Sequence, residues 1–198
     1  MLAKVCSAAV NGIEAYPVEV EVNVGYGDTL IILLGLPDAA VKESKDRVST
    51  ALTNSGYKFP MGRTTINLAP ADVRKEGPSF DLPIALGILA ASEQLETDQL
   101  DNFTVVGELA LTGAVRSCKG VLPIALRAQA EGKTGVIVPV ENAAEAAVVA
   151  GLQVIPVQNL REAAQFLEGE IKIAPLKVDL ARLFNQPCDD EADFAEVK

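Results

Sequence analysis

The first 36 residues carry the pattern that most restricts the fold of this chain. LAKVCSAAV, residues 2–10, is followed by Asn11-Gly12, a strong signal for a two-residue hairpin turn. IEAYPVEVEVNV, residues 13–24, then alternates polar and apolar residues, as a half-buried strand does. TLIILLGLP, residues 29–37, predicts a third and more buried strand. The start of the chain therefore predicts a β-sheet and argues against an all-helical domain.

Helical and extended patterns follow one another in mixed order through the rest of the chain. We expect helices over 38–55, from Ser79 to about Gln94, and over 120–132, 142–151 and 159–169, and strands over 64–70, 105–117 (two strands, or one bent at a glycine), 135–139 and 152–157. This order predicts an α+β or mixed α/β fold and argues against a doubly wound sheet. We expect one domain over residues 1–169, and an acidic linker or tail over 170–198 that packs poorly or only along the surface.

The composition excludes several classes of site. The 198 residues include no histidine, and the three cysteines, Cys6, Cys118 and Cys188, are far apart. We therefore expect no metal site, no imidazole base and no disulfide framework, and the cysteine usage indicates a reducing, cytoplasmic location. The longest apolar run, 82–91, has about half the length of a membrane-spanning helix, so we expect no membrane partner.

Gly132-Lys133-Thr134 resembles the end of a phosphate-binding loop with the pattern G-x-x-x-x-G-K-[ST]. Arg127 stands where the first glycine should be, and a helical pattern precedes the motif where a strand is required. Because that order decides whether backbone N–H groups point at phosphate, we expect no ATP site and no cofactor in this chain.

Ser79 lies where a charged loop meets an apolar helix, in RKEGPSFDLPIALGILAAS, residues 74–92. As a structural residue it would cap the helix through its hydroxyl, with Asp81 favourable near the positive helix end. As a nucleophile it would need a nearby base, which without histidine must be a lysine or a carboxylate. The residue types by themselves favour the cap.

Three segments carry a resemblance to a known family. They are GLPDAAVKESKDRV, NLAPADVRKEGPSFDLPIALGILAAS and VVGELALTGAVRSCKGVLPIALRAQAEGKTGVIVPVENA. From Met1 to about Gly169 the chain resembles the N-terminal domain of YifB/ComM-type, magnesium-chelatase-like AAA+ ATPases. The resemblance implies the fold of the Lon proteolytic domain, which is also found in a domain of a small-subunit ribosomal protein. That fold includes a left-handed β-α-β crossover, an exception to the usual handedness.

The same resemblance implies a protein longer than these 198 residues. DFAEVK at the end of the chain resembles the linker that leads into the ATPase module in this family, so we expect a fragment or a gene truncated at Lys198. The full-length protein would be a hexameric ATPase or helicase with ATP and Mg²⁺ in the missing module. The ComM branch of the family is associated with natural transformation and DNA branch migration.

Lon proteases use a Ser–Lys dyad, and this chain is similar to them in only one half of it. Their serine follows Gly-Pro or Gly-Asp at a helix start, as Ser79 does here. A gap-free alignment on the shared glycines places Leu122 at the position of the lysine, and leucine cannot accept a proton. Lys119 lies about one helical turn earlier, without the same geometry. The resemblance therefore implies a proteolytically inactive domain, not an enzyme, with Ser79 as a cap.

Residues 38–76 are the most basic part of an acidic chain. They hold seven basic and five acidic residues, a net charge of +2, whereas the whole chain carries −10. Candidates for contact with DNA phosphate are Lys42, Lys45, Arg63, Arg74 and Lys75. An ordinary solvated helix and loop would show the same charges.

The leading interpretation is a non-catalytic N-terminal domain of a hexameric, DNA-processing ATPase, which serves DNA contact or self-association into a ring. One alternative is an active Lon-like serine peptidase that uses Ser79 with Lys119 or another lysine. A second alternative is a chelatase-type scaffold that docks a protein or a metal-insertion complex.

Overall fold

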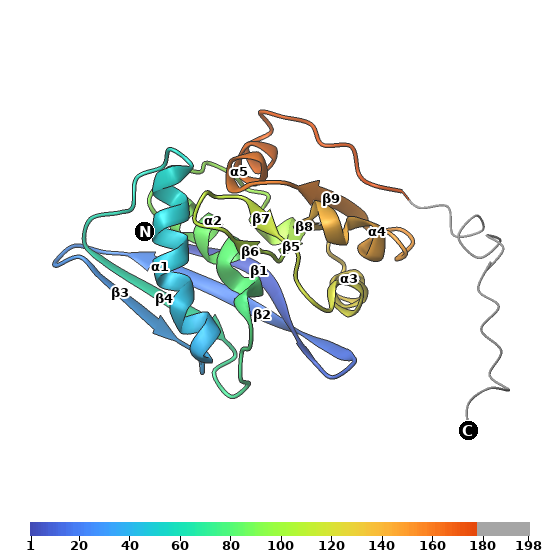
Figure 1. Ribbon diagram of the computed structural model, residues 1–198, viewed down its shortest axis with the longest axis horizontal. Coiled ribbons are helices and arrows are strands. Elements are labelled where there is room, and N and C mark those ends of the chain that lie inside the picture. Colours follow the sequence, from blue (N-terminus) through green and yellow to red (C-terminus); the bar gives the residue numbers. More distant parts are fainter. Residues whose placement is uncertain (178–198) are drawn as a thin grey trace, which may run out of the picture.

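The computed structural model describes residues 1–177, which form two larger sheets, a two-stranded ribbon and the helices around them (Figure 1). The strands are β1 (Leu2–Asn11), β2 (Glu14–Val24), β3 (Leu30–Leu34), β4 (Arg63–Ala69), β5 (Phe103–Val105), β6 (Glu108–Leu109), β7 (Val115–Arg116), β8 (Gly135–Pro139) and β9 (Gln153–Val157). The α-helices are α1 (Ala39–Asn54), α2 (Asp81–Ala91), α3 (Val121–Ala130), α4 (Ala143–Ala146) and α5 (Leu160–Glu168), and short 3-10 turns lie at Pro78–Phe80, Leu100–Asn102 and Val140–Asn142. This architecture is the α+β fold with a mixed sheet that the sequence predicts.

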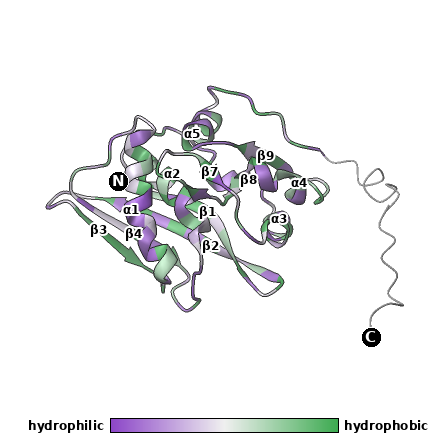
Figure 2. Ribbon diagram, viewed as in Figure 1, coloured by the Kyte–Doolittle hydropathy of each residue, from purple (hydrophilic) through white to green (hydrophobic). Residues whose placement is uncertain are grey.

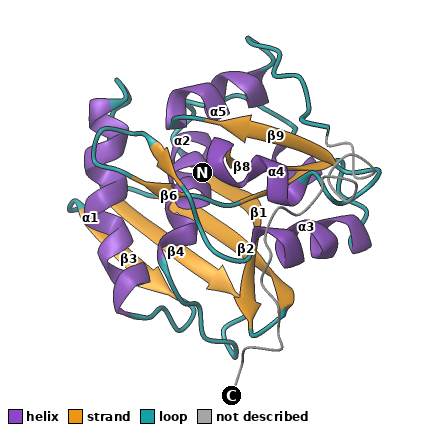
Figure 3. Ribbon diagram, turned by 45° about the vertical axis from the view of Figure 1, so that its right-hand side comes forward, coloured by secondary structure: helices purple, strands orange, loops and turns teal. Residues whose placement is uncertain are grey.

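The larger sheet has the strand order β1-β2-β4-β3 and is covered on one face by α1 and α2 (Figure 3). Strands β1 and β2 form the predicted antiparallel hairpin, in which Asn11 pairs with Glu14. The turn therefore lies at Gly12-Ile13, one residue later than predicted, and Gly12 takes the positive φ of 65° that favours glycine. Strands β3 and β4 are parallel, and α1 connects them.

Strand β3 is an exposed edge strand, and the prediction of a more buried strand is wrong. Leu30 and Leu34 are 52% and 47% exposed, although the strand is almost entirely hydrophobic (Figure 2). The reason is the strand order, because β4 takes the inner position and leaves β3 with a neighbour on one side only. Hydrophobicity alone cannot distinguish an edge strand from an inner one.

Helix α2 runs through the centre of the core. The sequence predicts that one face of this helix, with Leu82, Leu86 and Leu89, packs on the sheet, but every residue of α2 except Ala90 is buried. A Cβ at Gly87 would lie 2.7 Å from the side chain of Val22, so the missing side chain lets the helix approach β2 closely. A helix that is apolar all round is typical of such a buried position.

Residues 103–168 build a second, three-stranded parallel sheet with the order β5-β8-β9. Alternate residues of β8 face opposite ways. Ile137 belongs to the larger core with α2 and α5, whereas Val136 and Val138 belong to a smaller cluster with α3 and α4. This part of the chain is thus a small parallel sheet covered on both faces, which the sequence analysis did not anticipate.

The chain leaves α5 along the surface of this second sheet. The Leu176 N–H donates to the carbonyl oxygen of Val154 at 2.9 Å, and Ile173 is half-buried against the larger core. Residues 170–177 therefore lie along the surface. The rest of the predicted linker, including Cys188, lies outside the described residues. Within residues 1–177, no helix has the length and apolar character that a membrane crossing needs.

Candidate functional site

Ser79 lies in the 3-10 turn Pro78–Phe80 that precedes α2, and the prediction that it caps the helix is wrong. Helix α2 starts at Asp81, Phe80 occupies its N-cap position, and no side chain forms a capping hydrogen bond there. The extra turn displaces Ser79 from the position at which a hydroxyl could reach the first helical N–H groups. Its backbone carbonyl instead accepts a hydrogen bond from the Gly107 N–H at 2.9 Å.

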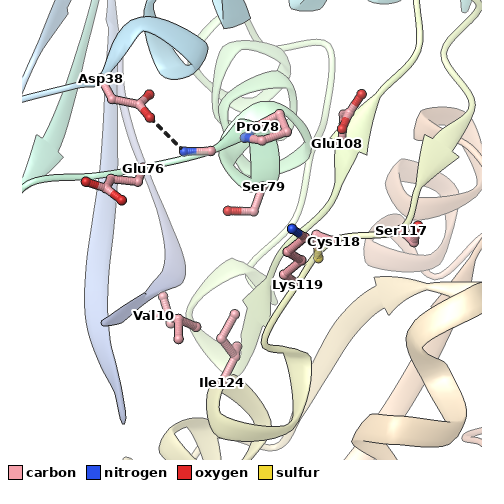
Figure 4. A pocket seen from close by; sticks show the side chains of 12 residues that line it. Val10, Asp38, Glu76, Pro78, Ser79, Glu108, Ser117, Cys118, Lys119 and Ile124 are labelled. Atoms are coloured by element: carbon pink, nitrogen blue, oxygen red, sulfur yellow. Dashed lines mark hydrogen bonds between the residues drawn. The ribbon is translucent and has the colours of Figure 1, made fainter. Parts of the chain in front are cut away.

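Asp38 fixes the loop that leads into this turn. One of its carboxylate oxygens accepts a hydrogen bond from the Val41 N–H at 2.8 Å and so caps α1, and the other accepts from the Gly77 N–H at 3.1 Å (Figure 4). The same loop pairs with the β3–α1 connection, where the Asp38 N–H donates to the Lys75 carbonyl at 3.0 Å. Gly77 has a φ of 82°, which the turn requires. Ser79 is therefore presented by a firmly anchored backbone.

A buried polar network lies behind the turn and centres on Asp81. The Asp81 carboxylate is fully buried. It accepts hydrogen bonds from Arg47 Nε at 2.8 Å, from the Leu109 N–H at 3.2 Å and from the Ser44 hydroxyl. Burial raises the pKa of Asp81, and the hydrogen bonds from Arg47 and Ser44 act in the opposite direction. The network joins α1, α2 and β6 and thereby holds the Ser79 turn in place.

The sequence analysis missed this network. It treated Asp81 only as a favourable charge near a helix end and Arg47 only as one cation among seven. A signal was present in α1, because Ser44 lies on the same helical face as Val41 and Val48, which are buried. A polar residue on the buried face of a helix requires a partner inside the protein.

A pocket of about 530 Å³ lies in front of the turn (Figure 4). It is lined by Ala8, Val10, Asp38, Glu76, Gly77, Pro78, Ser79, Glu108, Ser117, Cys118, Lys119 and Ile124. These residues come from four distant parts of the sequence, namely β1, the start of α1 at Asp38, the 76–79 loop, and the stretch 108–124 from β6 to α3. The sequence-predicted pair Ser79 and Lys119 thus lines one pocket.

The pocket holds a serine and a lysine that do not form a dyad. Within residues 1–177, neither Ser79 Oγ nor Lys119 Nζ has a hydrogen-bond partner, and Lys119 is exposed. Leu122 is not among the described residues that line the pocket. It is partly buried against the smaller core cluster, and its N–H donates to Glu145 at 2.9 Å. Proton transfer between a base and a nucleophile needs a hydrogen bond or one bridging water.

Cys118 forms part of the pocket wall and is uncharged at neutral pH. Burial, together with the nearby carboxylates of Glu145 and Glu108, raises the pKa of its thiol from 9.0 to about 12. Asn142 holds the backbone here, because it donates to the Cys118 carbonyl at 3.0 Å and accepts from its N–H at 2.9 Å. In the part of the chain that the structure describes, no group of three or more Cys, Asp or Glu side chains could hold a metal ion.

Lys75 is not available for the contact with DNA that the sequence analysis predicted. Its side chain is fully buried, and its amine donates to the carbonyl oxygens of Val73, at 2.7 Å, and Pro70. Burial lowers the pKa of this amine. A side chain enclosed in this way cannot reach a phosphate group, and its role is to hold the 70–77 loop together.

The remaining candidates divide between two ends of the larger sheet. Lys42 and Arg74 line one shallow hollow beside the start of α1, and Lys45 lies exposed about one turn further along that helix. Arg63 begins β4, so it lies about 20 Å from the other end of that strand, where the Arg74 loop starts. The Arg74 side chain also pairs with Glu76 at 3.3 Å on the surface. The five residues therefore do not form one patch.

Comparison with known proteins adds sequence similarity to this geometry. Residues 20–142 match the family described as subunit ChlI of Mg-chelatase. Competence protein ComM of Haemophilus influenzae is 46% identical over 181 residues, which cover 91% of this chain and 35% of that protein. YifB of Salmonella typhimurium is 44% identical over 181 residues, 91% of this chain and 36% of that protein. Lon protease 2 of Bacillus subtilis is 31% identical over 122 residues, 61% of this chain and 22% of that protein. The chain thus spans about a third of the length of ComM and YifB.

Proposed function

Because the chain belongs to the family of the magnesium-chelatase subunit ChlI and is of the YifB/ComM type, we propose that it is the non-catalytic N-terminal domain of a hexameric, DNA-processing AAA+ ATPase. One observation carries the proposal for this domain. Ser79 shares its pocket with Lys119 and three carboxylates, but no hydrogen bond joins its hydroxyl to any of them within residues 1–177. A serine hydroxyl without a hydrogen-bonded base is a weak nucleophile at neutral pH.

The proposed role of the domain is contact with DNA or with neighbouring subunits of a ring. The exposed cations Lys42, Lys45 and Arg74 at the start of α1 support a contact with phosphate. The name of ComM, competence protein, supports a role connected with DNA uptake. ATP and Mg²⁺ would bind in a module outside these 198 residues. The wide spacing of the cysteines favours a cytoplasmic location.

The absence of catalysis at Ser79 is tested with a fluorophosphonate probe. We expect the purified chain neither to react with the probe at Ser79 nor to hydrolyse casein, while an active serine peptidase in a parallel sample does both. Stoichiometric labelling that disappears in Ser79→Ala would replace the proposal with the peptidase alternative. Loss of that labelling in Lys119→Met would then identify the base, since Lys119 lines the same pocket.

Contact with DNA is tested with two double variants of the full-length protein, each of which reverses two positive charges. Lys42→Glu with Arg74→Glu changes the hollow beside α1, and Arg63→Glu with Lys58→Glu changes exposed positions elsewhere. We expect the first pair to weaken DNA binding and to reduce the salt slope by about 2, because each lost phosphate contact contributes about 0.9. We expect the second pair to change little.

A docking scaffold is the second candidate, and the match of residues 20–142 to the ChlI family favours it. If neither pair of reversals changes DNA affinity in an intact assembly, DNA binding belongs to other parts of the protein. The domain then keeps a role in docking a protein or assembling the ring.

A further inference from the structure

The carboxylates at the edge of the Ser79 pocket already have partners. Glu76 and Glu108 each form an ion pair with a neighbouring arginine, at 3.3 and 3.5 Å. Asp38 accepts hydrogen bonds from two backbone N–H groups, at 2.8 and 3.1 Å. The two arginines offset part of the charge of Glu76 and Glu108, and the two N–H groups stabilise the Asp38 carboxylate, although Glu108 still contributes to the raised pKa of the Cys118 thiol.

Ser79 and Lys119 are hydrogen-bond donors in the pocket that are available to a ligand. Ser79 Oγ and Lys119 Nζ have no hydrogen-bond partner within residues 1–177, and both side chains line the pocket (Figure 4). A hydroxyl and an ammonium group can both donate to a single carboxylate, and such charge-assisted hydrogen bonds are stronger than neutral ones. The unpaired groups of this pocket thus fit an acceptor with a negative charge.

The opposite wall of the pocket is apolar. Val10 and Ile124 lie across from Ser79 in Figure 4, and Ala8 is buried beside them. The Cys118 thiol adds no charge, because its pKa is raised to about 12. A volume of about 530 Å³ is within the range of small-ligand sites, and an aliphatic group buried here would gain hydrophobic free energy.

We propose that the Ser79 pocket binds a carboxylate that is attached to an aliphatic group, as at the C-terminus of a peptide that ends in leucine. The carboxylate accepts hydrogen bonds from Ser79 and Lys119, and the aliphatic group packs against Val10 and Ile124. This inference rests on the proposed absence of catalysis, because here Ser79 is a donor to a bound ligand and not a nucleophile.

The test is a titration of the ¹⁵N-labelled chain, followed by NMR, with N-acetyl-leucine and with its neutral amide. We expect saturable shifts at the backbone amides of Gly77, Ser79 and Lys119, with a dissociation constant of about 1 mM for the acid, since it has about 12 heavy atoms. The amide should bind at least about tenfold more weakly, because it lacks the charge that Lys119 recognises. Equal binding of acid and amide, or shifts confined to other surfaces, would overturn the proposal.

Three variants distinguish binding in the pocket from a general effect of charge on the protein. Lys119→Met should weaken binding of the acid about tenfold, whereas Lys58→Met, which removes the same charge from an exposed position outside the pocket, should leave binding unchanged. Ser79→Ala should weaken binding about two- to fivefold and keep the preference for the acid. An equal effect of Lys119→Met and Lys58→Met would contradict a specific site.

The carboxylate could belong to the end of a polypeptide or to a small carboxylic acid. A third ligand, acetyl-Ala-Ala-Leu with a free C-terminus, distinguishes the two. Tighter binding of this peptide than of N-acetyl-leucine assigns the site to polypeptide ends, and equal binding assigns it to small carboxylic acids. Both results support carboxylate binding. Reaction of Ser79 with the fluorophosphonate probe would instead overturn the proposed function, so the two ideas fail in different experiments.

Discussion

The two sides of the turn at residues 78–80 differ in how their polar groups are satisfied. Behind the turn, Asp81 is fully buried and accepts hydrogen bonds from α1 and β6. In front of it, Ser79 and Lys119 line a pocket and have no hydrogen-bond partner within the described residues. The buried side therefore holds the turn in place, and we expect the loss of the Ser79 hydroxyl on the pocket side to affect folding little.

The largest effect is expected on the buried side, for Asp81→Ala. This change leaves the Arg47 guanidinium, which is only 21% exposed, without its buried partner, while the exposed Glu43 remains at 3.6 Å. Breaking a buried ion pair costs about 3–5 kcal/mol. The free energy of unfolding, measured with urea, should fall by that amount. The double variant Asp81→Ala with Arg47→Met should recover part of the loss. A loss below about 1 kcal/mol for the single variant would show that the network does not hold the turn.

A second prediction concerns Cys118, which forms part of the pocket wall. Since the pKa of its thiol rises from 9.0 to about 12, the native chain should hold about a thousandfold less thiolate at pH 8 than the unfolded chain. Alkylation of Cys118 by iodoacetamide, followed by mass spectrometry, should be slower in the native state by about that factor.

The sign of the pH dependence follows from the same shift. The folded state binds the thiol proton more tightly than the unfolded state, so stability from this group is complete below about pH 9 and is lost as the pH rises toward 12. Cys118→Ala should remove this part of the pH dependence. Equal alkylation rates in the native and urea-unfolded chains would contradict the raised pKa.

The smallest effect is expected on the pocket side, for Ser79→Ala. The hydroxyl caps no helix, so the free energy of unfolding should change by less than about 0.5 kcal/mol. Ser44→Ala is the matched control, because it removes a hydroxyl that donates to Asp81 and should cost about 1–2 kcal/mol. Equal losses of unfolding free energy in the two variants would show that the two sides of the turn do not differ in their contribution to stability.

Elements with signals in their own residues were predicted well. Helix α1 begins after its cap Asp38, and α5 begins after Asn159, whose side chain accepts from the Glu162 N–H at 2.9 Å. Helix α5 ends at Gly169 with a φ of 76°. Caps and glycine stops act over a few residues, so they can be read locally.

The candidate site was predicted only in part. Ser79 and Lys119 do line one pocket, but the cap assigned to Ser79 is wrong and Lys75 is buried. A charged residue on a loop is expected at the surface, and the sequence does not show that the 70–77 loop folds its own carbonyl groups around the Lys75 amine. The partners of such side chains depend on the path of the backbone.

The sequence by itself determined the hairpin, the helices with caps and the general α+β class, because each depends on interactions between residues close in the chain. Only the tertiary structure decided that β3 is an edge strand, that Asp81 meets Arg47, and that Ser79 and Lys119 line the same pocket. These pairs lie 34 and 40 residues apart in the sequence. The physical reason is that burial and strand order depend on how distant segments pack, and side-chain partners in the core follow from that packing.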